Sequence, residues 1–376
     1  MRPASKPDET PHVHDAGPGR APAPRMKFSP QKLARRVRAL RGRRIGVAGD
    51  LMLDRYLWGT ATRLSPESPV PVVDYAAQSE CLGGAGNVAA NLAALGAKVT
   101  PFGVVGDDEP AAALRHRLAD LDLPDQGVLT DPARMTTLKT RIIARHQQIV
   151  RIDRERRAPL DPKTEDRLIR RIKVALPKLD ALVVSDYDKG VVTAALAERV
   201  LDACHRRGVR AFVKPKISLQ FSYRGATAIV CNRAEAAFLV QQNTLEDDAA
   251  IEQAGRALLG HFGCSAVVIT LGEKGMSVFE ETSPRRLHIP ATSFEVTYAR
   301  VGMPGLEPGA TGRQVFDVTG AGDTVLSTLA LASAAGASMP EAAALANLAA
   351  GVVVGKLGTA TVSNAELLAA VREIAK

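Results

Sequence analysis

Aromatic residues and cysteines are scarce in this sequence. Phe, Trp and Tyr make up 4% of its 376 residues, whereas hydrophobic residues in total make up 46%. We therefore expect a core built largely from Ala, Val and Leu, which suits helices packed on a mostly parallel sheet. The four cysteines include no C-x-x-C pair, which argues against a zinc site and a disulfide framework. Buried free thiols in a reducing cytoplasm are expected at Cys81, Cys204, Cys231 and Cys264.

Long hydrophobic runs are also missing, and the excess positive charge is confined to one end. No uncharged apolar run reaches the ~18 residues of a membrane span, and the N-terminus lacks the apolar core of a secretory signal. The net charge is +9, but residues 1–44 hold twelve of the 49 basic residues and only three of the 40 acidic residues. The remainder is neutral, offers no basic field to a polyanion, and so predicts no nucleic-acid partner.

Residues 1–43 are predicted to form a disordered basic arm that ends in a short helix. Residues 1–26 are rich in Pro, Gly, Ala and His, a composition typical of disorder. Ser29 and Pro30 suit the N-cap and the first position of a helix, and residues 32–44 follow as its basic body. A solvated helix face is the simplest interpretation, and anchoring to an acidic surface is the alternative.

Strands and helices are predicted to alternate over residues 44–376, which implies a parallel sheet. Short apolar runs predict strands at residues 44–49, 98–105, 181–185, 211–214, 227–231, 266–270, 276–279 and 287–289. Helices are predicted at residues 109–121, 164–176, 192–207, 247–262, 340–354 and 364–374. The expected fold is therefore a doubly wound α/β domain, with a mostly parallel sheet flanked by helices.

A small β lid is predicted outside this sheet, from segments near residues 56–75 and 136–153. Three prolines bar residues 64–73 from a central strand, so they predict an edge strand. Residues 136–153 alternate β-branched and polar residues, which is typical of a hairpin or of two edge strands. Its period of two places Lys139, Arg141, Arg145 and Arg151 on one face. That face would suit a phosphorylated substrate, and an ordinary solvated strand face is the alternative.

The nonapeptide Phe-Asp-Val-Thr-Gly-Ala-Gly-Asp-Thr, residues 316–324, carries the strongest chemical signal. The apolar run that follows predicts a buried helix. Gly320 and Gly322 would leave the backbone N–H groups of its first turn bare, where the helix dipole favours an anion. Asp323 could then take a proton from a hydroxyl while those N–H groups hold a phosphoryl group. The alternative is a loop with Asp323 as a helix cap.

Further polar residues follow the predicted strand at residues 44–49. Asp50 and Asp54 lie where open α/β sheets bind ligands, and could hold sugar hydroxyls or simply cap a turn. Residues 83–87, Gly-Gly-Ala-Gly-Asn, open a helix and match a dinucleotide fingerprint only in part, because no proper strand precedes them. A dinucleotide-binding oxidoreductase is therefore a distant alternative. Asn87 and Asn91 lie on one face of this helix.

The nonapeptide closely resembles the C-terminal signature of the ribokinase-like (PfkB) carbohydrate kinases, and the order of elements resembles that family over residues 44–374. The resemblance implies ATP and Mg²⁺ as cofactors. It makes Asp323 the catalytic base, with the backbone of Gly320, Ala321 and Gly322 around the phosphoryl group. Residues 232–235 match the family's N-x-x-E segment, although a helix N-cap at Asn232 is the alternative. The implied nucleotide site comprises Asn232, Arg233, Ala234, Glu235, Lys216 and Gly272, with Glu235 holding Mg²⁺ through water.

Several longer stretches resemble the branch of this family that phosphorylates heptose 7-phosphates. They are residues 49–56, 65–73, 147–153, 182–187, 223–227 and 351–359. This implies transfer to the anomeric hydroxyl of D-glycero-β-D-manno-heptose 7-phosphate, giving the 1,7-bisphosphate for ADP-heptose and lipopolysaccharide core synthesis, by a homodimer joined through the lid. The sequence resembles a stand-alone kinase without an adenylyltransferase domain. The implied substrate residues are Asp50, Asp54, Gly84 and Asn87 for the sugar, Lys139 and Arg141 for the 7-phosphate, and Asp186 and Lys189 along the cleft.

Three features depart from the family's pattern. Residues 214–217 read Lys-Pro-Lys-Ile where relatives usually read Asp-Pro-Lys-Gly, Cys231 replaces a proline, and residues 298–313 look inserted. Lys214 could strengthen ATP binding together with Lys216, or the lost carboxylate could weaken metal placement. Two alternatives therefore stay open: a kinase of this family for another sugar or hydroxyl, and a ligand-binding homologue that does not catalyse.

Overall fold

A nine-stranded sheet forms the centre of the molecule in the computed structural model. The structure describes residues 28–144, 147–216, 223–292, 296–297, 311–312, 320–356 and 360–374. The strands of the main sheet are β1 (Arg44–Gly49), β4 (Lys98–Val105), β5 (Val128–Thr130), β8 (Ala181–Ser185), β9 (Arg210–Lys214), β10 (Ala228–Asn232), β11 (Ala266–Thr270), β12 (Met276–Glu280) and β13 (Leu287–Ile289). Their order is β13-β12-β11-β10-β9-β8-β1-β4-β5, and β12 and β13 alone run antiparallel to their neighbours.

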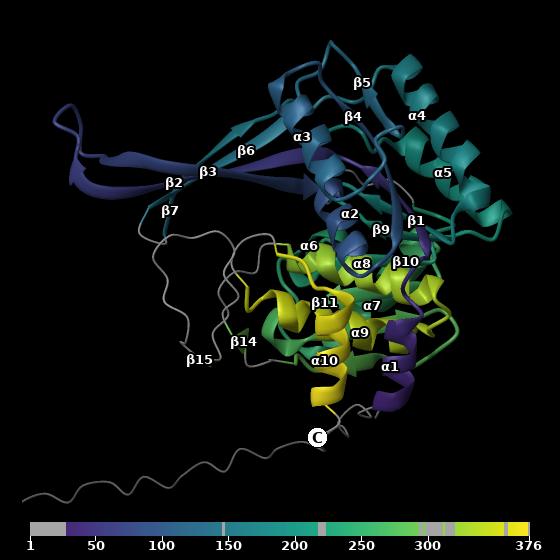
Figure 1. Cartoon of the computed structure of the whole chain (residues 1–376). Helices are drawn as coiled ribbons and strands as arrows, with labels where there is room; N and C mark the ends of the chain where they lie inside the picture. The colour runs from purple at the N-terminus through teal and green to yellow at the C-terminus, as the bar shows by residue number, and fades with distance from the viewer. Residues whose placement is uncertain are drawn as a thin grey trace, which may run out of the picture.

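Helices cover both faces of this sheet (Figure 1). One face packs against α1 (Pro30–Arg38), α2 (Ala85–Ala94), α3 (Glu109–Asp120), α8 (Ala321–Ala334), α9 (Met339–Val353) and α10 (Asn364–Glu373). The other packs against α4 (Pro162–Ala175), α5 (Ala194–Arg206), α6 (Arg233–Leu239) and α7 (Asp248–Phe262). Along β8, Ala181 and Val183 enter the first core while Leu182 and Val184 enter the second, as the alternation of strand side chains requires. The predicted doubly wound α/β fold is confirmed.

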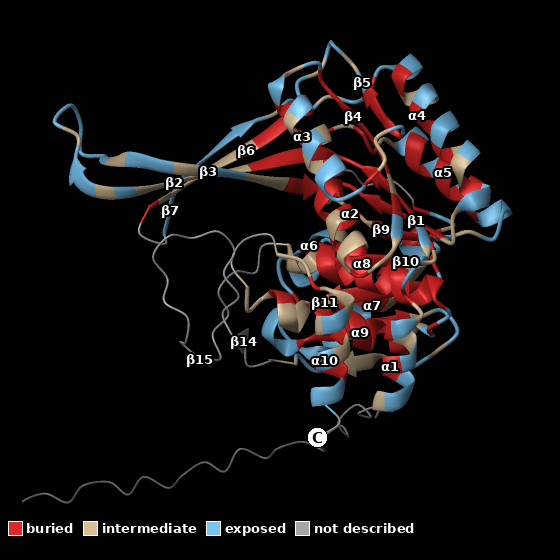
Figure 2. Ribbon diagram, in the orientation of Figure 1, coloured by how far each residue is buried: buried red, intermediate tan, exposed pale blue. Residues whose placement is uncertain are grey.

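The lid is a second sheet that leaves the body as a long hairpin. It contains β2 (Leu51–Leu64), β3 (Pro71–Gly84), β6 (Thr137–Ala144) and β7 (Gln147–Arg154), in the order β3-β2-β6-β7. The hairpin predicted over residues 136–153 is confirmed as β6 and β7. The range of the edge strand predicted over residues 64–73 is wrong, because β2 ends at Leu64, β3 begins at Pro71 and the prolines between them occupy the turn. Its predicted place is confirmed, because β3 is an edge strand of this small sheet. The outer part of the hairpin is exposed, whereas the main sheet is buried (Figure 2).

The predicted basic helix ends earlier than expected and is not simply solvated. α1 stops at Arg38 rather than near residue 44, and Ser29 caps it by accepting the N–H of Lys32. Its inner face, with Leu33 and Val37, is fully buried beside α9 and α10. Glu341 of α9 forms ion pairs with Lys32 and Arg36. Lys32 and Arg36 therefore bind a carboxylate of the same chain. The arm of residues 1–27 lies outside the described residues.

The remaining short elements lie at the edges of the fold. Two 3₁₀ turns, η1 (Leu176–Lys178) and η2 (Gly272–Lys274), and a two-stranded pair, β14 (Val296–Thr297) and β15 (Thr311–Gly312), complete the described elements. The insertion predicted at residues 298–313 lies outside the described residues apart from Thr311 and Gly312. Over the described ranges, no helix combines the length and the apolar character that crossing a membrane requires.

Candidate active site

Polar residues gather at the carboxyl edge of the main sheet, where parallel strands end together. Asp50 follows β1, Asp186 and Tyr187 follow β8, and Lys214 ends β9. The register of neighbouring strands pairs Gly49 with Ser185 and Ser185 with Lys214, so these ends lie side by side. The N-terminus of α8 meets the same edge, because Asp323 contacts the side chains of Lys214 and Tyr187.

Asp323 lies in the first turn of α8 and is 4% exposed. Its Oδ1 accepts hydrogen bonds from the hydroxyl of Tyr187 at 2.5 Å and from Nζ of Lys214 at 2.8 Å. Its Oδ2 accepts one from Nδ2 of Asn87 at 2.8 Å. Three separate segments therefore fix the carboxylate that the sequence nominated as a base.

Among the described residues, backbone N–H groups at the start of α8 lie near Asp323 without an acceptor. Gly320 begins α8 with a φ of +84°, a conformation that favours glycine. Its carbonyl accepts the N–H groups of Asp323 and Thr324, both at 3.0 Å. Within the described part of the chain, no acceptor lies against the N–H groups of Ala321 and Gly322. The N–H of Asp323, which was predicted to hold the phosphoryl group, is therefore taken by the carbonyl of Gly320, and residues 316–319 lie outside the described residues.

A buried polar network behind Asp323 orients Asn87. Nδ2 of Asn91 donates to Oδ1 and to the carbonyl of Asn87, and Oγ1 of Thr324 donates to Oδ1 of Asn91. These bonds leave the amide nitrogen of Asn87 to face the carboxylate. The structure thus places Asn87 against Asp323, while its predicted contact with a sugar stays a prediction. Sequence analysis noted that Asn91 shares a face with Asn87, but it missed this supporting role.

Asp50 organises a loop instead of facing open space. It is 1% exposed, and its carboxylate accepts the N–H groups of Tyr187, Lys189 and Val191 at 2.8, 3.3 and 3.0 Å. Burial raises the pKa of Asp50, although these N–H groups oppose the shift. Gly84 lies close by, because a Cβ there would come within 2.5 Å of the Asp50 carbonyl. Asp50 therefore caps the loop of residues 187–191, which was the alternative to sugar binding. By holding this loop, Asp50 also positions Tyr187.

Asp186 is also buried within the fold, at 2% exposure. Its carboxylate accepts hydrogen bonds from the hydroxyl of Tyr223 at 3.1 Å and from the N–H of Asp188 at 2.8 Å. Burial raises the pKa of Asp186 to about 7. Its predicted place along the cleft stays a prediction, since its two oxygens serve contacts within the protein.

The second sheet contributes an ion pair between Asp54 and Arg141. On β2, Asp54 is 4% exposed and accepts a 2.8 Å hydrogen bond from Arg141 of β6. Burial raises the pKa of Asp54, and Arg141 opposes the shift. Gly83 leaves room for this carboxylate, because a Cβ there would lie 2.7 Å from Oδ2 of Asp54. Arg141, predicted to bind the 7-phosphate, thus pairs with the residue predicted to bind the sugar.

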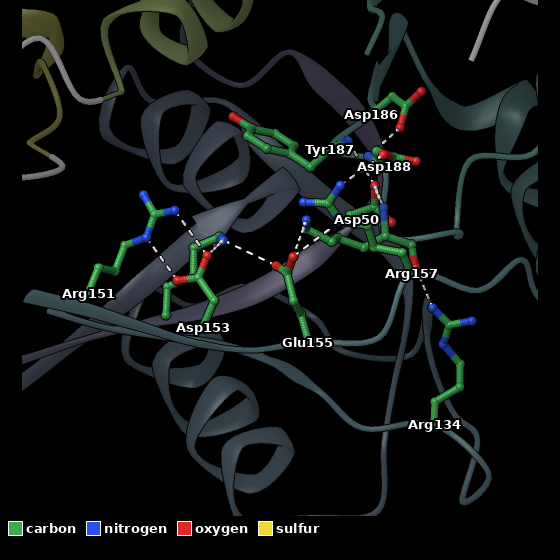
Figure 3. A network of polar contacts seen from close by, with 11 residues as sticks. Asp50, Arg134, Arg151, Asp153, Glu155, Arg157, Asp186, Tyr187 and Asp188 are labelled. Atoms are coloured by element: carbon green, nitrogen blue, oxygen red, sulfur yellow. Dashed lines mark hydrogen bonds and ion pairs between the residues drawn. The ribbon is translucent and has the colours of Figure 1, made fainter. Parts of the chain in front are cut away.

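Glu155 joins the lid to the loop after β8, and sequence analysis missed it. It forms ion pairs with Lys139 at 3.2 Å, Lys189 at 2.9 Å and Arg157 at 3.3 Å, and the surrounding network is shown in Figure 3. Lys139 also binds Asp153 at 2.9 Å. Burial would raise the pKa of Glu155, but the lysines hold it below its ordinary value. The predicted cationic face therefore carries its own carboxylates, and Arg145 lies outside the described residues.

The predicted nucleotide segment forms the start of α6. Oδ1 of Asn232 accepts the N–H of Glu235, and Oε2 of Glu235 accepts the N–H of Asn232, both at 2.8 Å. The helix-cap alternative at Asn232 is therefore confirmed. Glu235 is 8% exposed, whereas Arg233 and Ala234 are exposed.

Two further residues predicted to bind nucleotide flank this edge of the sheet. Gly272 is exposed at the start of η2 with a φ of +62°, and Lys216 is half-buried just after β9. Among the described residues, no group of three or more His, Cys, Asp or Glu side chains could hold a metal.

Comparison with known sequences assigns the chain to a family. The pfkB family carbohydrate kinases match residues 44–366. The bifunctional protein HldE of Geobacter sulfurreducens is 44% identical over 322 residues, which cover 86% of this chain and 61% of that relative. HldE of Caulobacter vibrioides is 44% identical over 342 residues, covering 90% and 65%. The chain thus spans less than two thirds of the length of these relatives.

Solved structures agree in fold. Arabidopsis thaliana ribokinase complexed with ribose and ATP has a TM-score of 0.64 at 18% identity, covering 88% of this chain and 99% of that one. Phosphofructokinase-2 from Escherichia coli in complex with fructose-6-phosphate has a TM-score of 0.65 at 18% identity, covering 89% and 99%. The chain therefore belongs to the pfkB family of carbohydrate kinases and is a sugar kinase with a ribokinase-like fold.

Proposed function

We propose that this kinase transfers the γ-phosphoryl group of ATP to the anomeric hydroxyl of D-glycero-β-D-manno-heptose 7-phosphate. One observation carries the proposal: the buried carboxylate of Asp323 lies beside the N–H groups of Ala321 and Gly322 at the start of α8. Asp323 takes the hydroxyl proton while those N–H groups hold the phosphoryl oxygens. Positioning and charge neutralisation supply most of the rate in such reactions.

The choice of sugar rests on the relatives and on the lid. The relatives are named as bifunctional HldE proteins, and the sequence stretches of the heptose 7-phosphate branch are spread along the chain. Lys139 and Arg141 of β6 would hold the 7-phosphate, and Lys189, which shares the carboxylate of Glu155 with Lys139, would line the cleft. The 1,7-bisphosphate would then feed ADP-heptose and lipopolysaccharide core synthesis in the cytoplasm.

Mg²⁺ would accompany the nucleotide, and Glu235 fits it as an outer ligand. Mg²⁺ prefers oxygen ligands, keeps several waters and often binds through one carboxylate and substrate phosphates. Glu235 uses Oε2 for the cap of α6, which leaves Oε1 for a metal-bound water. When bound, the ion would neutralise charge on the phosphate oxygens. Lys216, Gly272 and the start of α6 would line the nucleotide.

A homodimer joined through the lid is part of the proposal. Large apolar side chains are exposed on the β2–β3 hairpin, with Leu64 at 64% and Tyr75 at 66% exposure. On the other edge strand, Ile152 of β7 is 55% exposed. Exposed edge strands that carry apolar side chains are typical sites of association.

Mass spectrometry of the products tests this function. Incubation with MgATP and heptose 7-phosphate should give a heptose bisphosphate and an equal amount of ADP. A panel of other sugars and sugar phosphates, scored by ADP release, serves as the control. Faster turnover of another sugar would replace the heptose assignment, whereas binding of both ligands without any product would indicate a non-catalytic homologue.

A further inference from the structure

Lys214 lies at the point where the reacting groups would meet. Its Nζ is 2.8 Å from Oδ1 of Asp323 and 3.3 Å from the hydroxyl of Tyr187. A Cβ on Gly322 would lie 3.4 Å from the same nitrogen. The ammonium group therefore sits directly against the N-terminus of α8, beside the N–H groups that would hold a phosphoryl group.

The orientation of Asp323 does not depend on Lys214. Asn87 donates to Oδ2 and Tyr187 donates to Oδ1, so both oxygens have a neutral donor. What Lys214 adds is charge. Burial would lower the pKa of Lys214, but the carboxylate of Asp323 raises it above its ordinary value, which keeps the ammonium charged inside the site.

Lys214 also has the freedom to change partner. Its side chain is 19% exposed, and its ammonium lies 5.0 Å from the centroid of the Tyr187 ring. Gly322 places no side chain between the ammonium and the first turn of α8. A flexible four-carbon stem that ends in a compact charge can therefore turn from the carboxylate to an oxygen bound at that turn.

We propose that Nζ of Lys214 exchanges Asp323 for an oxygen of the transferred phosphoryl group, which makes Lys214 a catalytic residue. The inference rests on the proposed phosphoryl transfer at Asp323, but not on which sugar accepts the group. The ion pair between Lys214 and Asp323 is then present in the free enzyme and is given up as the phosphoryl group is bound and transferred.

The charges balance through the step. The O–H bond of the sugar hydroxyl breaks and its proton passes to Asp323, while the freed oxygen forms a bond to the γ-phosphorus. The bond from that phosphorus to the bridging oxygen breaks and ADP leaves with the electron pair. In the ATP complex the ammonium of Lys214 turns in part from Asp323 to an oxygen of the γ-phosphoryl group, and protonation of Asp323 then completes the exchange by removing the competing charge.

Binding of ATP and ADP tests the exchange without any need for turnover. In calorimetry with Mg²⁺, Lys214→Met should weaken ATP binding about tenfold, since a charge-assisted hydrogen bond is lost, and change ADP binding less than about twofold. Asp323→Asn should instead tighten ATP binding several-fold, because Lys214 then has no ion pair with a carboxylate to give up when it binds ATP. The double variant should lose that gain. Lys98→Met, at an exposed lysine at the start of β4 and so at the opposite end of the sheet, is the matched control.

Two results would overturn the proposal. One is an unchanged ratio of ATP to ADP affinity in Lys214→Met, with ADP binding as proof that the variant is folded. The other is an Asp323→Asn variant that binds ATP more weakly than the wild type, or whose affinities for ATP and ADP change by the same factor. This second result overturns the proposal even if Lys214→Met fails to fold. If the variants change ATP and ADP binding as predicted but the wild-type protein phosphorylates no sugar, only the proposed function is removed.

Discussion

The two oxygens of Asp323 have different surroundings, and that difference indicates which of them receives the proton. Oδ1 accepts from both Tyr187 and Lys214, whereas Oδ2 accepts only from Asn87 among the described residues. A carboxylate has about four lone-pair sites in all. Oδ2 therefore has the greater unused capacity, and the neutral donor beside it does not compete by charge. We infer that the sugar hydroxyl approaches Oδ2.

Asp186 should make stability depend on pH. Its pKa is about 7, above the ordinary value of 3.8, because burial disfavours the charged form. Between these two values the folded protein binds a proton that the unfolded chain has released, so the free energy of unfolding falls as pH rises towards 7. Asp186→Asn should remove this loss, on the order of 2 to 4 kcal/mol.

Thermal unfolding of wild type and Asp186→Asn at pH 5 and pH 8 measures this effect. The variant should gain stability relative to wild type at pH 8 and little at pH 5. Asp180→Asn, at a half-buried carboxylate paired with Arg44, controls for general effects of charge removal. If the difference in stability between wild type and Asp186→Asn is the same at both pH values, then burial does not raise the pKa of Asp186 as described.

Helix and strand ends build the site at the scale of elements. α8 carries Asp323, α2 carries Asn87, and β9 carries Lys214, so three elements distant in sequence converge on one carboxylate. The lid adds Lys139 on β6, which Glu155 connects to Lys189 in the body. Recognition of the sugar phosphate should therefore depend on the lid, and recognition of the nucleotide should not.

Lys139→Met tests the part played by the lid. The KM for the phosphorylated sugar should rise about tenfold, as expected for loss of one charged contact, and the KM for ATP should stay within about twofold. Arg151→Met is the matched control, because Arg151 pairs with Asp153 but its side chain is 49% exposed. Equal effects of the two substitutions on the sugar phosphate would argue against a phosphate contact at Lys139.

α1 is an integral helix of the domain, and Leu33→Ala should show it. Leu33 is 1% exposed in the core beside α10, and truncation of a buried Leu costs about 2 to 4 kcal/mol. Urea denaturation should give that loss for Leu33→Ala and little change for Arg35→Ala on the exposed face. Similar small losses from both would mean that the helix is only loosely attached.

At the scale of the whole molecule, the lid hairpin is the largest feature that the body does not cover. Light scattering of the wild type should give twice the monomer mass if the lid joins two copies. Tyr75→Asp on the exposed hairpin should shift the protein towards the monomer, since burying a charge in an apolar interface is unfavourable. A wild-type protein that remains monomeric at micromolar concentration would exclude the lid dimer.

Sequence alone predicted most of the architecture, because local periodicity determines each element. The strand at residues 181–185 and the buried helix after Gly320 appear as predicted, and Asp323 of the nonapeptide lies in the first turn of that helix. Pairings between distant side chains were out of reach. Nothing local in residues 151–157 selects Glu155 as the partner of Lys189, and nothing near Lys214 announces an ion pair with Asp323. Such contacts follow from the packed fold.

The turnover number of Asp323→Asn tests the central claim most directly. Asparagine keeps the size of the side chain but cannot take the hydroxyl proton. With MgATP and heptose 7-phosphate, kcat should fall by several orders of magnitude, on the order of 10³-fold or more, while ATP still binds at least as well as to the wild type. Turnover near the wild-type rate would contradict the assignment of Asp323 as the base.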